Sequence, residues 1–250
     1  MDSKYRRLRW FNVIMGLFHA VQGLVILLLA NDFSLPVTAT FLNGPPGASD
    51  PELSHLFDIR IAWGVATFVF LSALAHWLIA SPGIYSWYVR NLQHDRNYAR
   101  WIEYALSSSV MVVLIAMLPG ISDIAALGAI FGVNAAMILF GLLVEHYERP
   151  GHASWLAYWF GVLAGAVPWI LITFYIWSPG TDASPPAFVY GIFFSLFIFF
   201  NSFAVNMVLQ YRKIGKWSDY LYGERAYIIL SLVAKSLLAW QVFAGTLAPT

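Results

Sequence analysis

The stretch Ser231-Leu-Val-Ala-Lys235-Ser-Leu-Leu-Ala-Trp240 places a lysine inside the last long apolar run of the chain, Tyr220–Leu247. A run of this length can cross a bilayer as a helix, with Lys235 near the midplane. An unpaired charge there costs at least about 2.5–3.5 kcal/mol on insertion scales. Three explanations fit: a buried carboxylate partner, loss of the proton, or a covalent bond. A desolvated lysine amine also condenses with aldehydes to form a Schiff base.

The composition of the whole chain agrees with a membrane location. Of its 250 residues, 60% are hydrophobic and 11% are charged, whereas a soluble domain carries roughly 25% charged residues. We therefore predict a polytopic membrane protein. The net charge of +1 argues against nucleic acid or another acidic partner. The absence of cysteine excludes disulfides, thiol catalysis and thiolate metal sites.

Apolar runs of about twenty residues are the unit that spans a bilayer. Their positions predict an all-α, seven-helix bundle forming one domain over residues 1–250, with spans at Trp10–Leu29, Leu56–Ile79, Tyr98–Leu118, Ile121–Val144, Trp155–Trp177, Phe188–Leu209 and Tyr220–Leu247. The longest connection, Ala30–His55, holds an Asn43-Gly44 turn signal, and we expect a short strand at Val37–Leu42 before it.

Basic residues set the expected orientation, because cytoplasmic loops are enriched in Lys and Arg. They gather on one side of the predicted spans: Lys4, Arg6, Arg7, Arg9, Arg90, Arg96, Arg100, Arg149, Arg212, Lys213, Lys216 and Arg225. The connections on the other side, Ala30–His55, Pro119-Gly120, Ser178–Ala187 and Ala248–Thr250, contain none, and Arg60 is the exception at a span entry. We expect a multi-pass protein of the cell membrane, with its N-terminus cytoplasmic and its C-terminus extracellular.

Glu103 is the expected partner of Lys235. It is the one carboxylate deep within the predicted spans, since Asp58, Glu145 and Glu224 fall near span ends. Counted from the outer ends of their spans, Glu103 and Lys235 differ in depth by three residues, or about 4.5 Å. A single buried acid and a single buried base at matching depth are best interpreted as partners.

Other polar residues predict a cavity on the cytoplasmic side of this pair. His19 and His76 lie in the first two spans, each one turn from a further polar side chain, Gln22 and Ser72 respectively. A histidine at the depth of His76 is more often an interfacial residue, whereas His19 lies deeper and a polar cavity near Glu103 is the favoured explanation for it. Toward the outside, no Asp, Glu or His lies buried in any predicted span. A proton pump needs a relay on both sides of its switch, so this one-sidedness argues against pumping.

Aromatic side chains crowd the fifth and sixth spans and could clamp a long apolar ligand, although lipid-facing and packing aromatics are common. Two small-residue motifs, Gly128-x-x-x-Gly132 and Gly161-x-x-x-Gly165, fit either a dimer interface or packing within one chain.

The third span carries a specific resemblance. Arg100-x-x-Glu103-Tyr-x-x-Ser107-Ser108 resembles the Arg-x-x-Asp-Trp-x-x-Thr-Thr stretch of ion-pumping rhodopsins, with Glu103 as the counterion. Two features depart from the pumps: Ser231 stands four residues before the lysine, where pumps carry Asp, and the orientation is reversed. Both departures point to the heliorhodopsin family, which this chain resembles along its full length. His19, His76 and the long first outer loop also fit that family.

The resemblance implies a light-sensing photoreceptor. All-trans retinal would be bound to Lys235 as a protonated Schiff base, with Glu103 as counterion. Chromophore contacts would come from Ser231, Ser108, Met111, Asn134, Trp159 and Phe200. The proton cavity would comprise His19, His76, Gln22, Ser72, Tyr104 and Ser107. The family further implies a homodimer with a slow photocycle, no pumping, and an unidentified cytoplasmic signalling partner.

Other functions stay open at this stage. Because some heliorhodopsins conduct ions, a light-gated proton or ion channel using Glu103, His19 and His76 is the first alternative. A retinal-free receptor or transporter, with a purely structural Lys235–Glu103 pair, is the second. An enzyme is the least supported, because the chain has neither a nucleophile–base pair beyond these residues nor an H-E-x-x-H metal motif.

Overall fold

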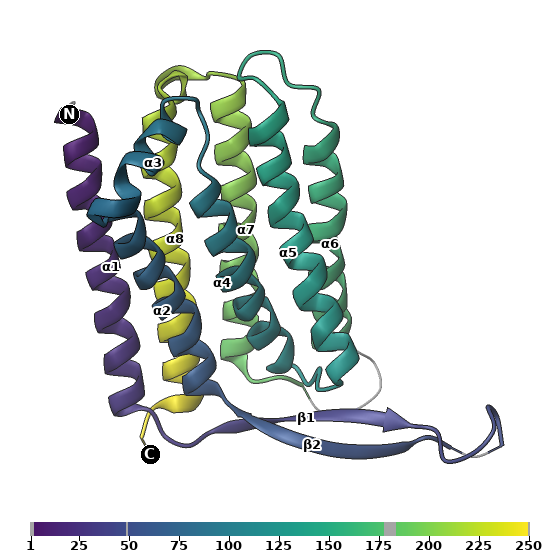
Figure 1. Ribbon diagram of the computed structural model, residues 1–250. Coiled ribbons are helices and arrows are strands. Elements are labelled where there is room, and N and C mark those ends of the chain that lie inside the picture. The colour runs from purple at the N-terminus through teal and green to yellow at the C-terminus, as the bar shows by residue number, and fades with distance from the viewer. Residues whose placement is uncertain (1–2, 49, 178–183, 250) are drawn as a thin grey trace.

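The computed structural model describes residues 3–48, 50–177 and 184–249. Within these residues, seven helices are long and apolar enough to cross a membrane. They run side by side as one bundle, with a β-hairpin at one end (Figure 1). Their bounds are α1 Ser3–Leu29, α2 Ile61–Ala80, α4 Tyr98–Met117, α5 Ile124–Tyr147, α6 Leu156–Ile176, α7 Ala187–Tyr211 and α8 Tyr220–Val242, with a π-helical turn at Phe243–Leu247 continuing α8.

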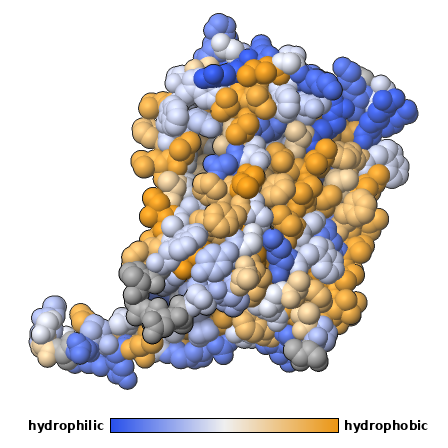
Figure 2. Space-filling model, turned by 180° about the vertical axis from the view of Figure 1, so that it is seen from behind, coloured by the Kyte–Doolittle hydropathy of each residue, from blue (hydrophilic) through white to orange (hydrophobic). Residues whose placement is uncertain are grey.

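The outer surface of the bundle is apolar along the helices, unlike the surface of a soluble protein. Many large apolar side chains face outward along the helices, while the more hydrophilic residues gather mostly toward the two ends (Figure 2). Helix α4 is the most enclosed, with 67% of its most apolar window buried. Asn97 begins this helix by accepting a hydrogen bond from the backbone N–H of Arg100 at 3.1 Å.

A short helix, α3 (Pro82–Leu92), lies across the bundle at the end that holds the N-terminus (Figure 1). Pro82 occupies its first turn, where a missing N–H costs nothing. The helix buries Tyr85, Tyr88 and Leu92 in a cluster that also contains Leu8 and Ile228. We refer to this end of the bundle as the α3 end. Spacing of the spans leaves this segment in a connection, because eleven residues are too short to cross a bilayer.

The opposite end, the hairpin end, carries strands β1 (Ser34–Phe41) and β2 (Glu52–Arg60), which pair antiparallel with a bulge at Val37/Thr38. The expected strand at Val37–Leu42 is present and begins earlier. The expected start of the second span is wrong, because residues 56–60 belong to β2, where residues 57–60 pair with β1, so α2 begins at Ile61. The hairpin is tied to the bundle where the Thr38 N–H donates to the Ser122 carbonyl at 2.9 Å.

The two Gly-x-x-x-Gly motifs differ in their surroundings. A Cβ added at Gly165 would collide with Met137, and one at Gly161 would lie 3.3 Å from the Cβ of Phe140, so this motif packs α6 against α5. By contrast, no atom of the described residues lies within 4 Å of a Cβ built at Gly128 or Gly132. Of the expected connection Ser178–Ala187, residues 178–183 lie outside the described residues, as does Thr250.

Candidate functional site

Lys235 is buried in the middle of α8. Its Nζ donates hydrogen bonds to Glu103 Oε1 at 2.7 Å and to Ser231 Oγ at 3.0 Å, and it lies 5.1 Å from the centre of the Tyr104 ring. Ser231 is one turn before Lys235, so both side chains leave the same face of α8. The structure thus brings together the acid and the base whose depths match in the sequence. A carboxylate, a hydroxyl and an aromatic face together compensate a buried ammonium.

Glu103 holds this position through a second helix. The Ser72 hydroxyl of α2 donates to Glu103 Oε1 at 2.6 Å. A hydroxyl bonded to an ionised carboxylate is a charge-assisted interaction and fixes the carboxylate's direction. Glu103 is therefore oriented by both α2 and α8, and its negative charge is directed at Lys235.

His19 and His76 lie beside each other, with ring centres 5.7 Å apart and planes 16° from parallel. His76 Nδ1 is 2.7 Å from Asn12 Oδ1, whereas neither ring nitrogen of the fully buried His19 has a partner among the described residues. Buried polar atoms in proteins almost always have a partner, which is often water. Bound water between His19 and its neighbours would supply one.

A small cavity of about 30 Å³ joins this region to Glu103. Its walls include Ser72, His76, Glu103 and Tyr104 toward Lys235, and Asn12, Tyr88, Asn97 and Arg100 toward the α3 end. A space of this size holds about two waters, at roughly 10–15 Å³ of accessible volume each. Burial raises the pKa of the Tyr88 phenol, which therefore stays neutral here.

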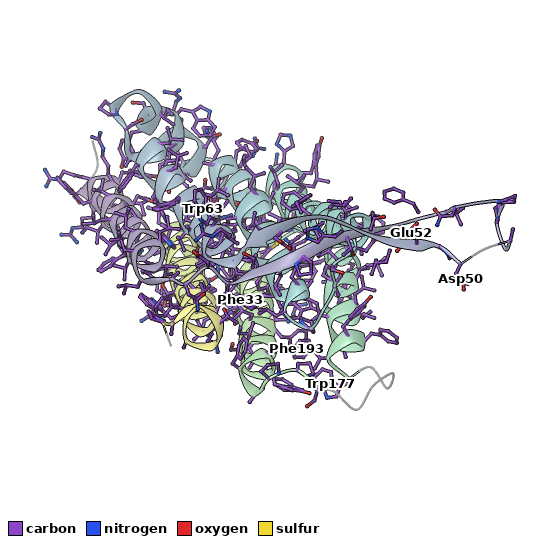
Figure 3. The ribbon with its side chains drawn as sticks, turned by 90° about the horizontal axis from the view of Figure 1, so that it is seen from below. Phe33, Asp50, Glu52, Trp63, Trp177 and Phe193 are labelled. Atoms are coloured by element: carbon purple, nitrogen blue, oxygen red, sulfur yellow. The ribbon has the colours of Figure 1, made fainter. Side chains whose placement is uncertain are left out.

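A much larger cavity of about 620 Å³ begins at Lys235 and extends between α4, α5, α6, α7 and α8. Most of its wall is apolar and aromatic, with Trp169, Phe193 and Phe200 among the lining residues. Trp177, at the end of α6, packs its ring 5.3 Å from that of Phe193 near the hairpin end (Figure 3). Pockets of roughly 300–1,000 Å³ with such walls enclose small apolar ligands.

Most of the expected chromophore contacts lie around this large cavity. Ser231, Ser108, Met111 and Phe200 line it, as do Tyr104 and Ser107 from the expected proton cavity. Asn134 lies one layer behind, where its amide donates to Ser108 Oγ at 2.9 Å and Ser109 Oγ at 3.0 Å. The cavity would accept a long apolar aldehyde, with the amine at its end and a carboxylate beside the amine.

Among the expected site residues, Asn134, His19, Trp159 and Gln22 line neither cavity, although Asn134 bonds Ser108 and His19 stacks on His76. Trp159 is 63% exposed on the outer face of α6, and its neighbour Tyr158 lines the large cavity instead. One residue step on a helix turns a side chain by about 100°, so aromatic density alone cannot choose between the two. Gln22 donates to the Phe18 carbonyl and accepts from the Trp240 indole, both at 3.2 Å, away from His19's ring nitrogens.

A second buried ionic group is not apparent from the sequence. Arg100 turns away from Glu103 and forms ion pairs with Glu145 of α5 and Glu224 of α8, all three being nearly inaccessible. Glu145 and Glu224 look interfacial in the sequence because they lie near span ends. The available signal is that Arg100, Glu145 and Glu224 all fall at the same end of their spans.

Comparisons with known proteins identify the family and the fold. The sequence model of a family described as heliorhodopsin matches residues 8–247. A search of curated protein sequences finds no significant match. Among solved structures, the proton pumping rhodopsin AR2 from the marine alga Acetabularia acetabulum is similar with a TM-score of 0.62 and 16% identity, covering 96% of this chain and 93% of that one.

A thermophilic rhodopsin is similar with a TM-score of 0.61 and 12% identity, covering 96% of this chain and 92% of the other. At these identities the two structures establish the fold, which is that of the microbial rhodopsins. The family match extends over nearly the whole chain, including Lys235 and Glu103. The chain is therefore a multi-pass membrane protein that belongs to the heliorhodopsin family of retinal photoreceptors.

Proposed function

We propose that the protein is a light sensor in which all-trans retinal is bound to Lys235 as a protonated Schiff base, with Glu103 as its counterion. The observation that carries this proposal is the position of the Lys235 amine, at the end of an apolar cavity of about 620 Å³ and 2.7 Å from Glu103. When bound, retinal supplies absorption of visible light and photoisomerisation, chemistry that side chains lack. The whole chain serves as one seven-helix domain.

The chain's own residues bind and orient the chromophore. Ser231, Ser108, Met111 and Phe200 contact it from the cavity wall, and Tyr158 replaces Trp159 among the expected contacts. Asn134 acts through Ser108, since its amide holds that hydroxyl. The Glu103 carboxylate stabilises a positive charge at Nζ of Lys235, and Ser72 keeps the carboxylate pointed there.

The same residues define where a proton leaving Nζ can go. Glu103 is the adjacent acceptor, and the small cavity beside it leads to His76, with His19 stacked behind. In the described part of the chain, every largely buried carboxylate or histidine lies level with Lys235 or toward the α3 end. A relay on one side only supports a photocycle without net pumping.

The proposed orientation follows from charge. The α3 end carries Arg6, Arg7, Arg9 and Arg90 and is proposed to be cytoplasmic in the cell membrane, with the hairpin outside. A cytoplasmic signalling partner would then contact the α3 end. We also propose a homodimer.

The absorption spectrum tests this function. The protein purified after expression with all-trans retinal should show a visible band that hydroxylamine bleaches, and Lys235→Ala should lack it. Lys216→Ala, which changes an exposed lysine outside the bundle core, should keep the band. No visible band in the unmodified protein would remove the retinal assignment, and Lys235 would then be half of a structural ion pair in a receptor or transporter.

A light-gated proton channel is the second candidate. The specific observation in its favour is the small polar cavity that reaches from Glu103 past His76 toward Asn12 and Asn97. Whole-cell currents under illumination separate the two candidates: a channel gives a current that reverses with the proton gradient, whereas a sensor gives none.

A further inference from the structure

Arg100, Glu145 and Glu224 form a buried cluster separate from the Lys235–Glu103 pair. Their side chains are 4%, 3% and 0% exposed, respectively. They come from α4, α5 and α8, and so hold three helices together at the α3 end. The Arg100 guanidinium contacts two aromatic rings, at 4.6 Å from the Trp101 ring centre and 4.0 Å from that of Tyr227. These two rings meet edge to face, and both stabilise the cation.

The two carboxylates are supported unequally. Glu145 accepts hydrogen bonds from four groups: the Asn97 N–H at 2.7 Å, the Arg100 guanidinium at 2.5 Å, the Trp101 indole at 2.5 Å and the Tyr220 hydroxyl at 2.8 Å. Glu224 accepts one from the Asn97 side-chain amide at 2.7 Å and pairs with Arg100. Four donors fill the acceptor positions of a carboxylate, whereas Glu224 meets only Asn97 and Arg100 among the described residues.

A charge count leaves the cluster one positive charge short. Two ionised carboxylates and one guanidinium would leave a net negative charge where water is excluded, which is strongly unfavourable. The other groups facing the cluster are the neutral phenols Tyr88, Tyr104, Tyr211, Tyr220 and Tyr227, with Asp95 and Lys213 at the exposed surface. Arg96 donates to the His146 carbonyl at 3.1 Å rather than to either carboxylate. Among the described residues, therefore, no second cation pairs with these carboxylates.

We propose that Glu145 and Glu224 bind one proton between them in the resting protein. Two carboxylates that share a confined site ionise one at a time because like charges repel. The cluster is thus a proton-binding site in addition to Glu103 and the histidines.

This site is connected to the one around Lys235. Arg100 and Asn97, which contact both glutamates, line the same small cavity as Glu103, Ser72 and His76. Waters in that cavity would reach from the Glu103 carboxylate to the guanidinium of the cluster. A change in charge at Glu103 would therefore act on the proton held by Glu145 and Glu224 through Arg100, which both sites share.

Infrared spectroscopy in the dark tests the proposal independently of any photochemistry. A protonated carboxylic acid gives a C=O stretch at higher frequency than the amide I band, and this band shifts in D₂O. We expect the band in the unmodified protein. We expect it to be missing in both Glu224→Gln and Glu145→Gln, because either change leaves one carboxylate paired with Arg100 and no shared proton. Glu148→Gln, which alters a carboxylate exposed beside Ser154, should retain the band.

Two results would overturn the proposal. One is a protonated-acid band that persists in either cluster variant. The other is the absence of any D₂O-sensitive band of this kind in the unmodified protein, a measurement that needs no variant and so remains decisive if a substitution prevents folding. Both measurements can be made on protein with or without retinal, so their failure is distinct from a failure of the light-sensor assignment.

Discussion

The ammonium of Lys235 is balanced by one carboxylate, that of Glu103. Replacing either residue therefore destabilises the protein. Removing one member of a buried ion pair leaves the other charge uncompensated and typically costs about 3–5 kcal/mol. Here Ser231 and Tyr104 supply only neutral contacts to Nζ. The charge on Glu103 therefore dominates the field at Lys235.

Glu103→Gln should change the colour and the acid–base behaviour of the bound chromophore. Without the carboxylate, a positive charge at Nζ is less stable, so the visible band should shift and should convert to the deprotonated form at lower pH than in the unmodified protein. Spectra recorded across a pH series measure both effects. Glu148→Gln serves as the matched control, and an unchanged band in Glu103→Gln would contradict the counterion assignment.

Ser72→Ala should have a smaller effect in a defined direction. The Ser72 hydroxyl shares the Glu103 oxygen that faces Lys235, at 2.6 Å. Without this donor, the Glu103 carboxylate interacts more strongly with the positive charge at Nζ of Lys235. We therefore expect the visible band to move to shorter wavelength. A hydrogen bond to a charged group contributes about 1.5–3 kcal/mol, so a lowered melting temperature should accompany the shift. Ser81→Ala, at an exposed hydroxyl that bonds the Leu78 carbonyl, should do neither.

The sequence predicts well how deep a residue lies along its span. Matching depths identify Glu103 as a partner for Lys235 because α4 and α8 run in the same direction at 1.5 Å per residue. The partner of Arg100 is not predictable in the same way. A long side chain can extend toward either end of its helix, so residue spacing places Arg100 on the face of Glu103 without showing that it turns toward Glu145 and Glu224.

Among the elements, α3 shows how a short segment can matter to the site. Its buried face carries Tyr85, Tyr88 and Leu92 at helical spacing, and Tyr88 lines the small cavity. A search for runs of about twenty apolar residues passes over an eleven-residue helix. The expected start of the second span at Leu56 is wrong for a different reason. The apolar residues of β2 continue directly into those of α2, so the boundary at Ile61 is set by the pairing of β2 with β1.

Tyr88→Phe should reduce the loss of stability at high pH. Burial raises the pKa of the Tyr88 phenol above its unfolded value. The stability associated with the neutral phenol is therefore fully present below about pH 10 and is lost as the pH rises further. Above that pH, one such phenol lowers the free energy of unfolding by about 1.4 kcal/mol per pH unit. Melting temperatures at about pH 8 and about pH 11 should therefore differ less in Tyr88→Phe than in the unmodified protein. Tyr147→Phe, at an exposed ring, should behave like the unmodified protein, and equal differences in all three would contradict the role of Tyr88.

For the whole molecule, the polar interior is arranged asymmetrically. The histidines, the small cavity and the Arg100 cluster lie level with Lys235 or on its α3 side, while the walls toward the hairpin end are mainly apolar. A suspension of cells that express the protein with retinal should consequently show no light-driven pH change that an uncoupler abolishes. A persistent, uncoupler-sensitive change would show that protons cross the molecule and would contradict the absence of pumping.

The orientation of the bundle can be tested because the sequence contains no cysteine, so a single introduced thiol is the sole site for a membrane-impermeant thiol reagent. Ala48→Cys places it in the exposed turn between β1 and β2, and Lys216→Cys places it in the exposed connection between α7 and α8 at the α3 end. Because the basic residues gather at the α3 end, intact cells should be labelled at position 48, and position 216 should react only after lysis. Retention of the visible band in both variants controls for folding. Labelling of intact cells at 216 and not at 48 would reverse the proposed orientation, and any signalling partner would then have to be sought at the hairpin.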